Sequence, residues 1–363
     1  MFMNLMKLVT LWIIAFLLWS CNASQSYYFY DCEYTLIENN CTVEKVVHQR
    51  DLTSIGENYN IFNMTIYDSI AVLMARDPRG IFPVVNVKDA EEIGVFVQRG
   101  RAFNELTTNS NINEIIKDND NLKAVFFDLN KNKMFKWNIS KSIDENTTIY
   151  DTIVEKPTIK NRIPFSEIFD LSNDLYLTTT NGVSIDGQIN KFITPEYTVR
   201  SITSDSLVCK YNVFRDSIAV LPPNNDMSIR YFVASNIMHP NKNKLAMVLS
   251  SFPQINILDI ETGDLKGYRL DGLTFSPHKR TIFYASACCD EKYIYALFNN
   301  LDIAELNTHL PLHNSRIHIF DWDGNLVKDV ELDGCFQVLR YWDGEFYALE
   351  RASGKIYTYR LNI

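Results

Sequence analysis

The stretch INILDIETGDLKGYRL (255–270) has the pattern of a β-hairpin, and the same pattern recurs in RIHIFDWDGNLVKDVEL (316–332) and KAVFFDLNKNKMFKWNI (123–139). In each, a strand rich in β-branched and aromatic residues ends near an acidic residue, a tight polar turn follows, and a second strand returns. The turns carry Gly or Asn, which adopt the positive φ angles that tight hairpins require. Weaker copies are GVSIDGQINKFITP (182–195) and VVNVKDAEEIGVF (84–96).

The hairpins, with a last one at 345–361, make six units along the chain. Repeats of about 40 residues or more, each with several short strands, are typical of a β-propeller. The sequence therefore predicts an all-β fold, a six-bladed β-propeller of four-stranded antiparallel blades. An N-terminal strand from 44–50 or 60–67 would close the ring. Short helical turns are expected only at 113–118 and 166–170.

The N-terminus carries an export signal. One cation, Lys7, precedes an apolar run at 8–18, and Leu18-Trp19-Ser20-Cys21 ends it. This run is shorter than the about 20 apolar residues that a membrane span needs, so we expect residues 1–20 to be a signal peptide. Residues 21–43 would then form an anchor or linker segment, and 44–363 the propeller domain.

Three motifs carry a resemblance to a known family. The segment around Cys21 resembles a bacterial lipobox, although Trp19 replaces the usual small residue. IGVFVQRGRAFNEL (93–106) resembles a first-blade loop, with Ala102 and Phe103 where Gly and Pro are usual, and 317–334 resembles a last-blade hairpin. These motifs are similar to those of the TolB-like six-bladed β-propeller lipoproteins. The resemblance implies the fold, export and lipidation (palmitate) of Cys21, and it transfers no catalytic residues.

The composition excludes some classes of partner. The chain has 363 residues, 46% of them hydrophobic, and a formal net charge of −9 without any basic run. Such acidity argues against nucleic acid and against anionic membrane surfaces as main partners. We expect a protein of the cell envelope, bound to the membrane through its lipid and facing the periplasm or the exterior.

Two further cysteines lie close to the anchor. Cys32 and Cys41 flank a turn-rich segment, and an oxidising compartment would allow them to form a disulfide. The alternative is two free, partly buried thiols. Zinc and redox spacings of the C-x-x-C type are absent from the sequence.

The loop of the 93–106 motif supplies the predicted ligand-binding residues, Arg99, Arg101 and Glu105. Its arginines would grip an anionic ligand. The favoured alternative is structural, with Arg101 and Glu105 holding the loop to a neighbouring blade.

Two metal-like patterns favour ordinary structural roles. Asp321, Asp323 and Asn325 have alternating oxygen ligands, but the spacing of the following residues fits a hairpin turn better than a calcium loop. His309, His313 and His318 lie within ten residues, and exposed histidines are favoured over a metal site. We therefore predict no cofactor, metal or catalytic residue.

The function that follows is binding. We expect a non-catalytic module that binds a protein, peptide or glycan on one face of the ring. The first alternative is a hydrolase or lactonase with a divalent cation in the central channel, since propeller enzymes assemble sites from several blades. The second is a structural scaffold within an envelope complex.

Overall fold

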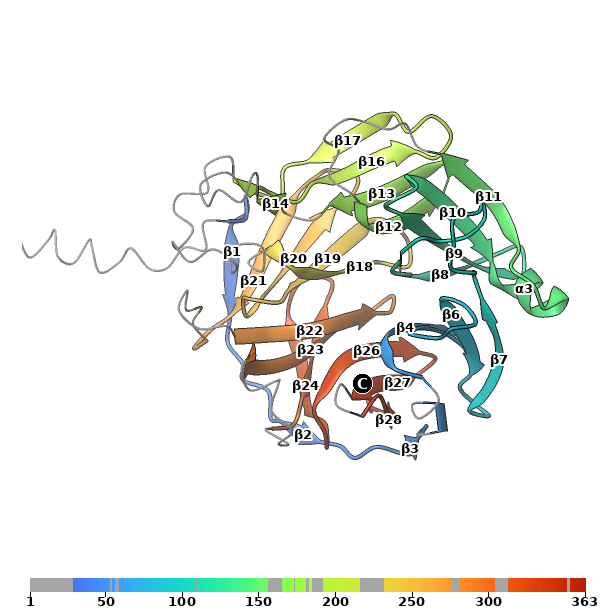
Figure 1. Cartoon of the computed structure of the whole chain (residues 1–363). Coiled ribbons are helices and arrows are strands. Elements are labelled where there is room, and N and C mark those ends of the chain that lie inside the picture. Colours follow the sequence, from blue (N-terminus) through green and yellow to red (C-terminus); the bar gives the residue numbers. More distant parts are fainter. Residues whose placement is uncertain are drawn as a thin grey trace, which may run out of the picture.

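The computed structural model describes residues 29–52, 54–55, 59–108, 110–155, 165–172, 174–180, 183–184, 192–215, 232–273, 275, 281–303, 313–350 and 353–363. They form a six-bladed β-propeller, in which six sheets surround a common axis (Figure 1). Each blade is built on four antiparallel strands, so the predicted fold class is confirmed.

Blades 1 to 3 come first along the chain. Blade 1 consists of β4 (Ile61–Tyr67), β5 (Ile70–Ala75), β6 (Phe82–Asn86) and β7 (Glu91–Phe96). Blade 2 consists of β8 (Ile115–Asp118), β9 (Asn121–Asp128), β10 (Lys133–Asn138) and β11 (Tyr150–Glu155). Blade 3 consists of β12 (Phe165–Ser172), β13 (Leu175–Thr180), β16 (Tyr197–Ser201) and β17 (Leu207–Tyr211).

Blades 4 to 6 complete the ring. Blade 4 consists of β18 (Ala234–Met238), β19 (Lys244–Leu249), β20 (Gln254–Asp259) and β21 (Leu265–Leu270). Blade 5 consists of β22 (Thr281–Cys289), β23 (Tyr293–Asp302), β24 (Arg316–Asp321) and β25 (Leu326–Glu331). Blade 6 has β26 (Phe336–Trp342), β27 (Glu345–Glu350) and β28 (Ile356–Arg360).

The N-terminal segment runs along the outer edges of blades 4, 5 and 6 (Figure 1). β1 (Tyr34–Ile37) pairs in parallel with β21, and β2 (Glu44–Lys45) pairs in parallel with β25. β3 (Arg50–Asp51) pairs antiparallel with β28 and is the fourth strand of blade 6. The closing strand thus begins at the end of the predicted 44–50 segment, whereas the other candidate, 60–67, is an inner strand of blade 1.

The expectation of helical turns at 113–118 and 166–170 is wrong. Residues 115–118 form β8 and residues 165–172 form β12, because each is the innermost strand of a blade and its pairing overrides local helix propensity. A helix that the sequence did not indicate, α3 (Ile139–Glu145), follows β10 directly. The Asn138 side chain caps it by accepting a hydrogen bond from the Lys141 amide.

The predicted 182–195 hairpin is displaced from its blade. Its described residues form the short pair β14 (Val183–Ser184) and β15 (Phe192–Ile193), a separate two-stranded sheet between β13 and β16. The hairpin proper of blade 3 is β13–β16. The weak copy of the pattern therefore marks an insertion.

The core consists of apolar layers between neighbouring blades. Between blades 1 and 2, Trp137 and Phe135 of β10 are fully buried with Phe82 and Phe126. The Phe82 and Trp137 rings stack with centroids 5.7 Å apart. Burying such large rings is the main favourable term in assembling the ring of blades.

Candidate functional site

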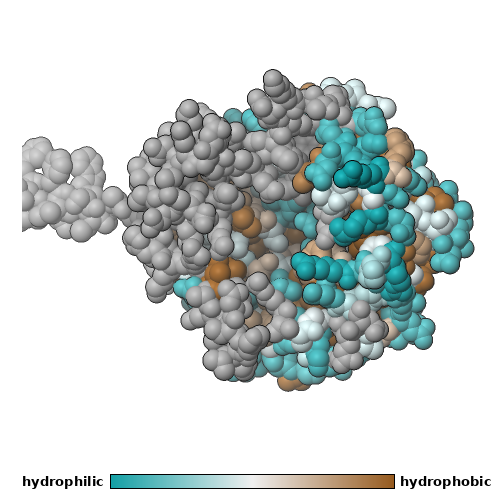
Figure 2. Space-filling view, viewed as in Figure 1, coloured by the Kyte–Doolittle hydropathy of each residue, from teal (hydrophilic) through white to brown (hydrophobic). Residues whose placement is uncertain are grey.

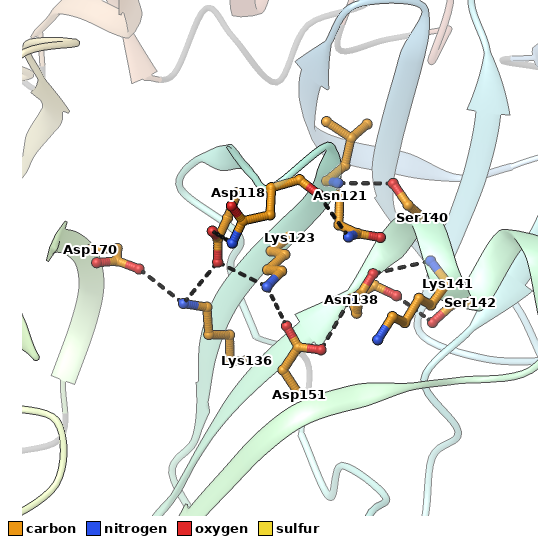
Figure 3. A network of polar contacts seen from close by, with 12 residues as sticks. Asp118, Asn121, Lys123, Lys136, Asn138, Ser140, Lys141, Ser142, Asp151 and Asp170 are labelled. Atoms are coloured by element: carbon orange, nitrogen blue, oxygen red, sulfur yellow. Dashed lines mark hydrogen bonds and ion pairs between the residues drawn. The ribbon is translucent and has the colours of Figure 1, made fainter.

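The candidate site is a polar pocket on the face of the ring where the turns at the ends of β8, β12 and β18 meet. It has a volume of about 380 Å³. Its lining comes from blades 2, 3 and 4 and consists of Ile116, Lys117, Asp118, Lys136, Asp170, Asp174, Ile202 and Lys242. Blades 2 and 3 supply most of the charged network around it (Figure 3).

Lys123 is tightly bound within this network. Its Nζ lies 2.8 Å from Asp118 and 2.6 Å from Asp151, and only 11% of its side chain is exposed. The hydrogen bond from Lys123 lowers the pKa of Asp118. Lys123 therefore acts as a structural cation that ties β8 and β9 to β11.

Lys136 of β10 is held more loosely. Its Nζ lies 3.6 Å from an Asp170 oxygen and 3.9 Å from an Asp118 oxygen, and both distances exceed that of a hydrogen bond (Figure 3). About a quarter of its side chain is exposed. Lys136 thus retains donor capacity for a ligand.

Lys242 links three blades. In the β18–β19 turn, its Nζ lies 2.6 Å from a Glu114 oxygen, and the other Glu114 oxygen accepts a hydrogen bond from the Asp170 amide at 3.1 Å. Burial raises the pKa of Glu114, and Lys242 opposes this rise. The contacts fix the backbone of Asp170 at the pocket wall.

Asp174 supports the neighbouring turn. Its carboxylate accepts hydrogen bonds from the Ser201 hydroxyl at 2.8 Å and from the Thr203 amide at 3.1 Å. Its own φ is +63°, a left-handed conformation that Asp tolerates better than most residues. Asp174 is therefore largely committed to the structure of blade 3.

An apolar cavity of about 130 Å³ lies between blades 2 and 3 and adjoins the polar pocket. The two spaces share Lys136, Asp170 and Ile202. The remaining lining is mostly hydrocarbon: Val125, Met134, Thr152, Val154, Ile168 and Tyr176. A polar mouth over an apolar interior is the usual composition of a small-ligand site.

The surface around these blades is mixed in character. In Figure 2, hydrophilic side chains cover much of the right-hand side, over blades 1 and 2, with hydrophobic residues between them. Within the part of the chain that the structure describes, no group of three His, Cys, Asp or Glu side chains is placed to hold a metal ion.

The predicted ligand residues lie elsewhere, in the loop that follows β7. Arg99 forms a bridge with Leu106, and the Glu105 carboxylate accepts a hydrogen bond from the Ala102 amide at 2.8 Å. Lys131 of blade 2 donates to the carbonyls of Ala102 and Glu105 at 2.5 and 2.7 Å. Glu105 thus stabilises the loop itself, and Lys131 holds it to the next blade. Ligand binding by Arg99, Arg101 and Glu105 stays a prediction.

The structure holds Cys32 and Cys41 as free thiols. The Cys32 sulfur lies 4.0 Å from the Asn256 side chain in blade 4, and the Cys41 sulfur lies 3.7 Å from the Leu326 carbonyl in blade 5. The two side chains therefore contact different blades, and a disulfide between them stays a prediction. Cys21 and the signal sequence, 1–20, lie outside the described residues.

The Asp321 segment forms a hairpin turn, as favoured. The Asp321 carboxylate accepts from the amides of Asp323 and Asn325 at 3.0 and 2.8 Å. Gly324 has a φ of +88°, so the β24–β25 turn uses its glycine in the left-handed region.

The expectation of exposed histidines is wrong for His318, which is 1% exposed. Its ring stacks on Phe298, with centroids 4.2 Å apart, and its Nδ1 lies 3.1 Å from the Tyr284 hydroxyl. Burial lowers the pKa of His318 to about 3. His313 is exposed, and its Nε2 lies 2.5 Å from the Asn299 carbonyl. His309 lies outside the described residues.

Sequence reasoning missed the residues of the polar pocket. Lys136, Asp170 and Lys242 lie on three blades and are separated by 34 and 72 positions, so no local motif joins them. One available signal was Lys136 itself, a charge between the two large aromatic residues Phe135 and Trp137.

Comparisons with known proteins support the fold. No protein-family model matches the sequence, and no curated protein matches it. A solved member of the DUF4221 family from Bacteroides vulgatus is similar, with a TM-score of 0.55 and 9% identity, over 82% of this chain and 90% of that chain.

Two other solved structures are similar at lower scores. A protein described as exported, from Bacteroides fragilis, has a TM-score of 0.49 and 9% identity over 92% of this chain and 94% of its own. Regucalcin, a calcium-binding protein from Agrobacterium tumefaciens, has a TM-score of 0.48 and 8% identity over 87% and 95%. None of the described helices has the length and hydrophobicity to cross a membrane.

Proposed function

We propose that this protein is a TolB-like, lipid-anchored propeller of the cell envelope that binds its ligand without converting it. The observation that carries the proposal is the pocket of about 380 Å³ where blades 2, 3 and 4 meet. Its lysines and carboxylates come from separate blades, which gives a ligand several polar contacts on one rigid face. A protein, peptide or glycan offers groups that match them.

The pairing of the pocket's charges supports a binding role. Lys242 is engaged by Glu114 at 2.6 Å, and Asp174 accepts hydrogen bonds from Ser201 and Thr203. Charges held in this way fix the blades around the pocket and leave Lys136 to contact a ligand, while a catalytic acid or base needs an available proton site. Nothing among the described residues favours the alternative of a divalent-cation hydrolase.

The anchor would hold the ring close to the membrane. Phe29, eight residues after Cys21, is buried against Phe232 and Phe252 beside blade 4. Eight extended residues span at most roughly 29 Å. With Cys21 lipidated, the propeller would sit at the envelope membrane and present its faces to neighbouring components.

A retention experiment tests the function. The full processed protein, in detergent micelles, is incubated with defined pools of peptides and oligosaccharides, and retained compounds are identified by mass spectrometry. We expect retention of compounds from at least one pool, recovered unmodified, and loss of retention in Lys136→Glu. The matched control, Lys210→Glu on the outer strand β17, should retain them. Recovery of cleaved products, or equal retention by Lys136→Glu, would contradict the proposal.

A further inference from the structure

We propose that the site recognises an apolar α-amino acid, either free or at the end of a peptide chain. This proposal rests on the proposed binding function and names the chemistry of its ligand. The amino acid side chain would enter the cavity between blades 2 and 3. Its polar main-chain groups would remain at the mouth, between Lys136 and Asp170.

The size and polarity of the cavity determine which ligand side chain it can accept. Its volume of about 130 Å³ is lined mainly by the hydrocarbon of Val125, Met134, Val154 and Ile168. For comparison, an apolar protein cavity of about 150 Å³ stays dry and accepts benzene. A leucine or phenylalanine side chain is of the right size and polarity. A charged side chain would lose its hydration there without a counter-charge deep in the cavity.

The charged residues at the mouth determine which polar main-chain groups the ligand must carry. Lys136 and Asp170 line both the cavity and the polar pocket, and their charged atoms are 3.6 Å apart. A ligand acceptor oxygen would pair with the Lys136 ammonium, and a ligand N–H donor would pair with the Asp170 carboxylate. An α-amino acid carries both groups on one carbon, next to its side chain.

The contacts around the mouth distinguish Lys136 from two neighbouring lysines, which are held in short ion pairs. Lys123 is held by carboxylates at 2.8 and 2.6 Å, and Lys242 is held by Glu114 at 2.6 Å. The Asp170 amide is held by Glu114, which fixes the strand that carries its carboxylate. Lys136, which lines both spaces, can therefore engage a ligand without breaking a short ion pair.

Three sources can offer this chemistry. A free amino acid has both charges, a peptide N-terminus has an ammonium beside a carbonyl, and a peptide C-terminus has an amide N–H beside a carboxylate. Calorimetric titration of the full processed protein with leucine, Leu-Gly-Gly and Gly-Gly-Leu distinguishes them. We expect at least one to bind, and the one that binds most tightly identifies the source.

Two truncated ligands test the mouth. The acid 4-methylpentanoate lacks the donor, and 3-methylbutylamine lacks the acceptor. We expect each to bind at least tenfold more weakly than the best of the three amino-acid ligands. Equal binding of either would overturn the assignment of Lys136 and Asp170 as a paired recognition site.

Variants test the two halves of the site. Lys136→Met should weaken binding at least tenfold, and Val154→Phe, which fills the cavity from β11, should abolish it. Thr152→Phe, at a more exposed cavity position on the same strand, provides a second filling variant if Val154→Phe does not fold. The matched control is Lys210→Met on the outer strand β17, which lines neither the cavity nor the polar pocket and should bind within twofold of wild type.

The outcomes separate this inference from the proposed function. No binding of any of the three ligands at millimolar concentration, or unchanged affinity in Lys136→Met and in a folded filling variant, would overturn it. A second outcome is that wild type binds none of the three ligands and still retains other compounds from the pools, while Lys136→Glu retains none of them. In that case the binding function would stand with a different ligand. If nothing were retained, both would fall.

Discussion

Glu167 shows how burial controls a single group in this ring. It lies on β12, accepts a hydrogen bond from Thr179 at 3.1 Å, and also accepts one from Asn236 of blade 4. Burial raises its pKa to about 7, although both hydrogen bonds act in the opposite direction. The carboxyl group is thus poised to lose its proton near neutral pH inside the wall between two blades.

This pKa predicts a stability change with pH. Because the folded pKa lies above the unfolded value of about 4.3, the stability that the neutral group contributes is present at pH 4 and is lost as the pH rises through 7. Glu167→Gln stays neutral and can still accept from Asn236. We expect its unfolding free energy to match wild type at pH 4 and exceed it by about 3 to 4 kcal/mol at pH 8, since each pKa unit corresponds to about 1.4 kcal/mol.

The measurement is chemical denaturation at both pH values. Comparing the two proteins cancels the opposite contribution of His318, whose lowered pKa makes stability rise from pH 3 to 6.5. An equal difference in unfolding free energy between variant and wild type at pH 4 and pH 8 would contradict the raised pKa of Glu167 in the folded protein.

The roles of some residues could be predicted from the sequence because their contacts are to residues nearby in the chain. The roles of others could not, because their contacts are to other strands or blades. The Asp321 turn was predictable because its polar contacts lie within five consecutive residues. His318 was not, because its burial depends on Tyr284 and Phe298 of two other strands of blade 5, β22 and β23. The Lys136–Asp170 pair was also hidden, because it crosses from blade 2 to blade 3.

At the scale of elements, the repeated hairpins mark different positions within the blades. The hairpins at 84–96, 255–270 and 316–332 are the third and fourth strands of their blades. Those at 123–139 and 345–361 are the second and third strands. This explains their uneven spacing. The sequence was sufficient to predict strands and number of blades, but assigning strands to blades depends on long-range pairing.

The β24–β25 turn offers a test of contacts between blades. A Cβ atom added at Gly324 would lie 2.3 Å from the Tyr268 ring of blade 4, and φ is +88°. The matched control, Gly344, has a φ of +79° with no atom within 4 Å. We expect Gly344→Ala to cost about 1 kcal/mol of stability and Gly324→Ala about 2 to 3. Equal losses, measured by denaturation, would contradict the close packing of Gly324 on Tyr268.

Ring closure gives a second test at this scale. β28 lies between β27 and β3, so deleting 355–363 removes one strand and unpairs another. We expect cooperative thermal unfolding, followed by circular dichroism, to be lost. Deleting only 362–363, beyond the last strand, should leave the transition nearly unchanged. A 355–363 deletion that melts like the full chain would require an open array of blades in place of a closed ring.

At the scale of the whole molecule, the N-terminal segment and the candidate site occupy different parts of the ring. The segment from β1 to β3 covers the outer edges of blades 4, 5 and 6. The pocket lies where blades 2, 3 and 4 meet. The segment therefore does not cover the outer edges of blades 2 and 3, and an anchor attached to it would lie on the side of blades 4 to 6.

The anchor itself is tested by Cys21→Ser. We expect this variant to remain unprocessed or to leave the membrane fraction, because acyl chains supply about 0.8 kcal/mol of membrane affinity per buried CH₂. Fractionation and mass spectrometry of the N-terminus provide the measurement, with Cys32→Ser as the matched control that should stay anchored. Unchanged processing and fractionation of Cys21→Ser would contradict lipidation.

The most direct test of the account is to map where a retained ligand binds. Hydrogen–deuterium exchange of the full processed protein, with and without the ligand, reports this at the level of peptides. We predict that protection concentrates on the wall of the pocket, in 114–118, 134–136, 168–176 and 240–243. Protection confined to other blades, or to the loop at 99–106, would contradict the claim that the face of blades 2 to 4 is the binding site.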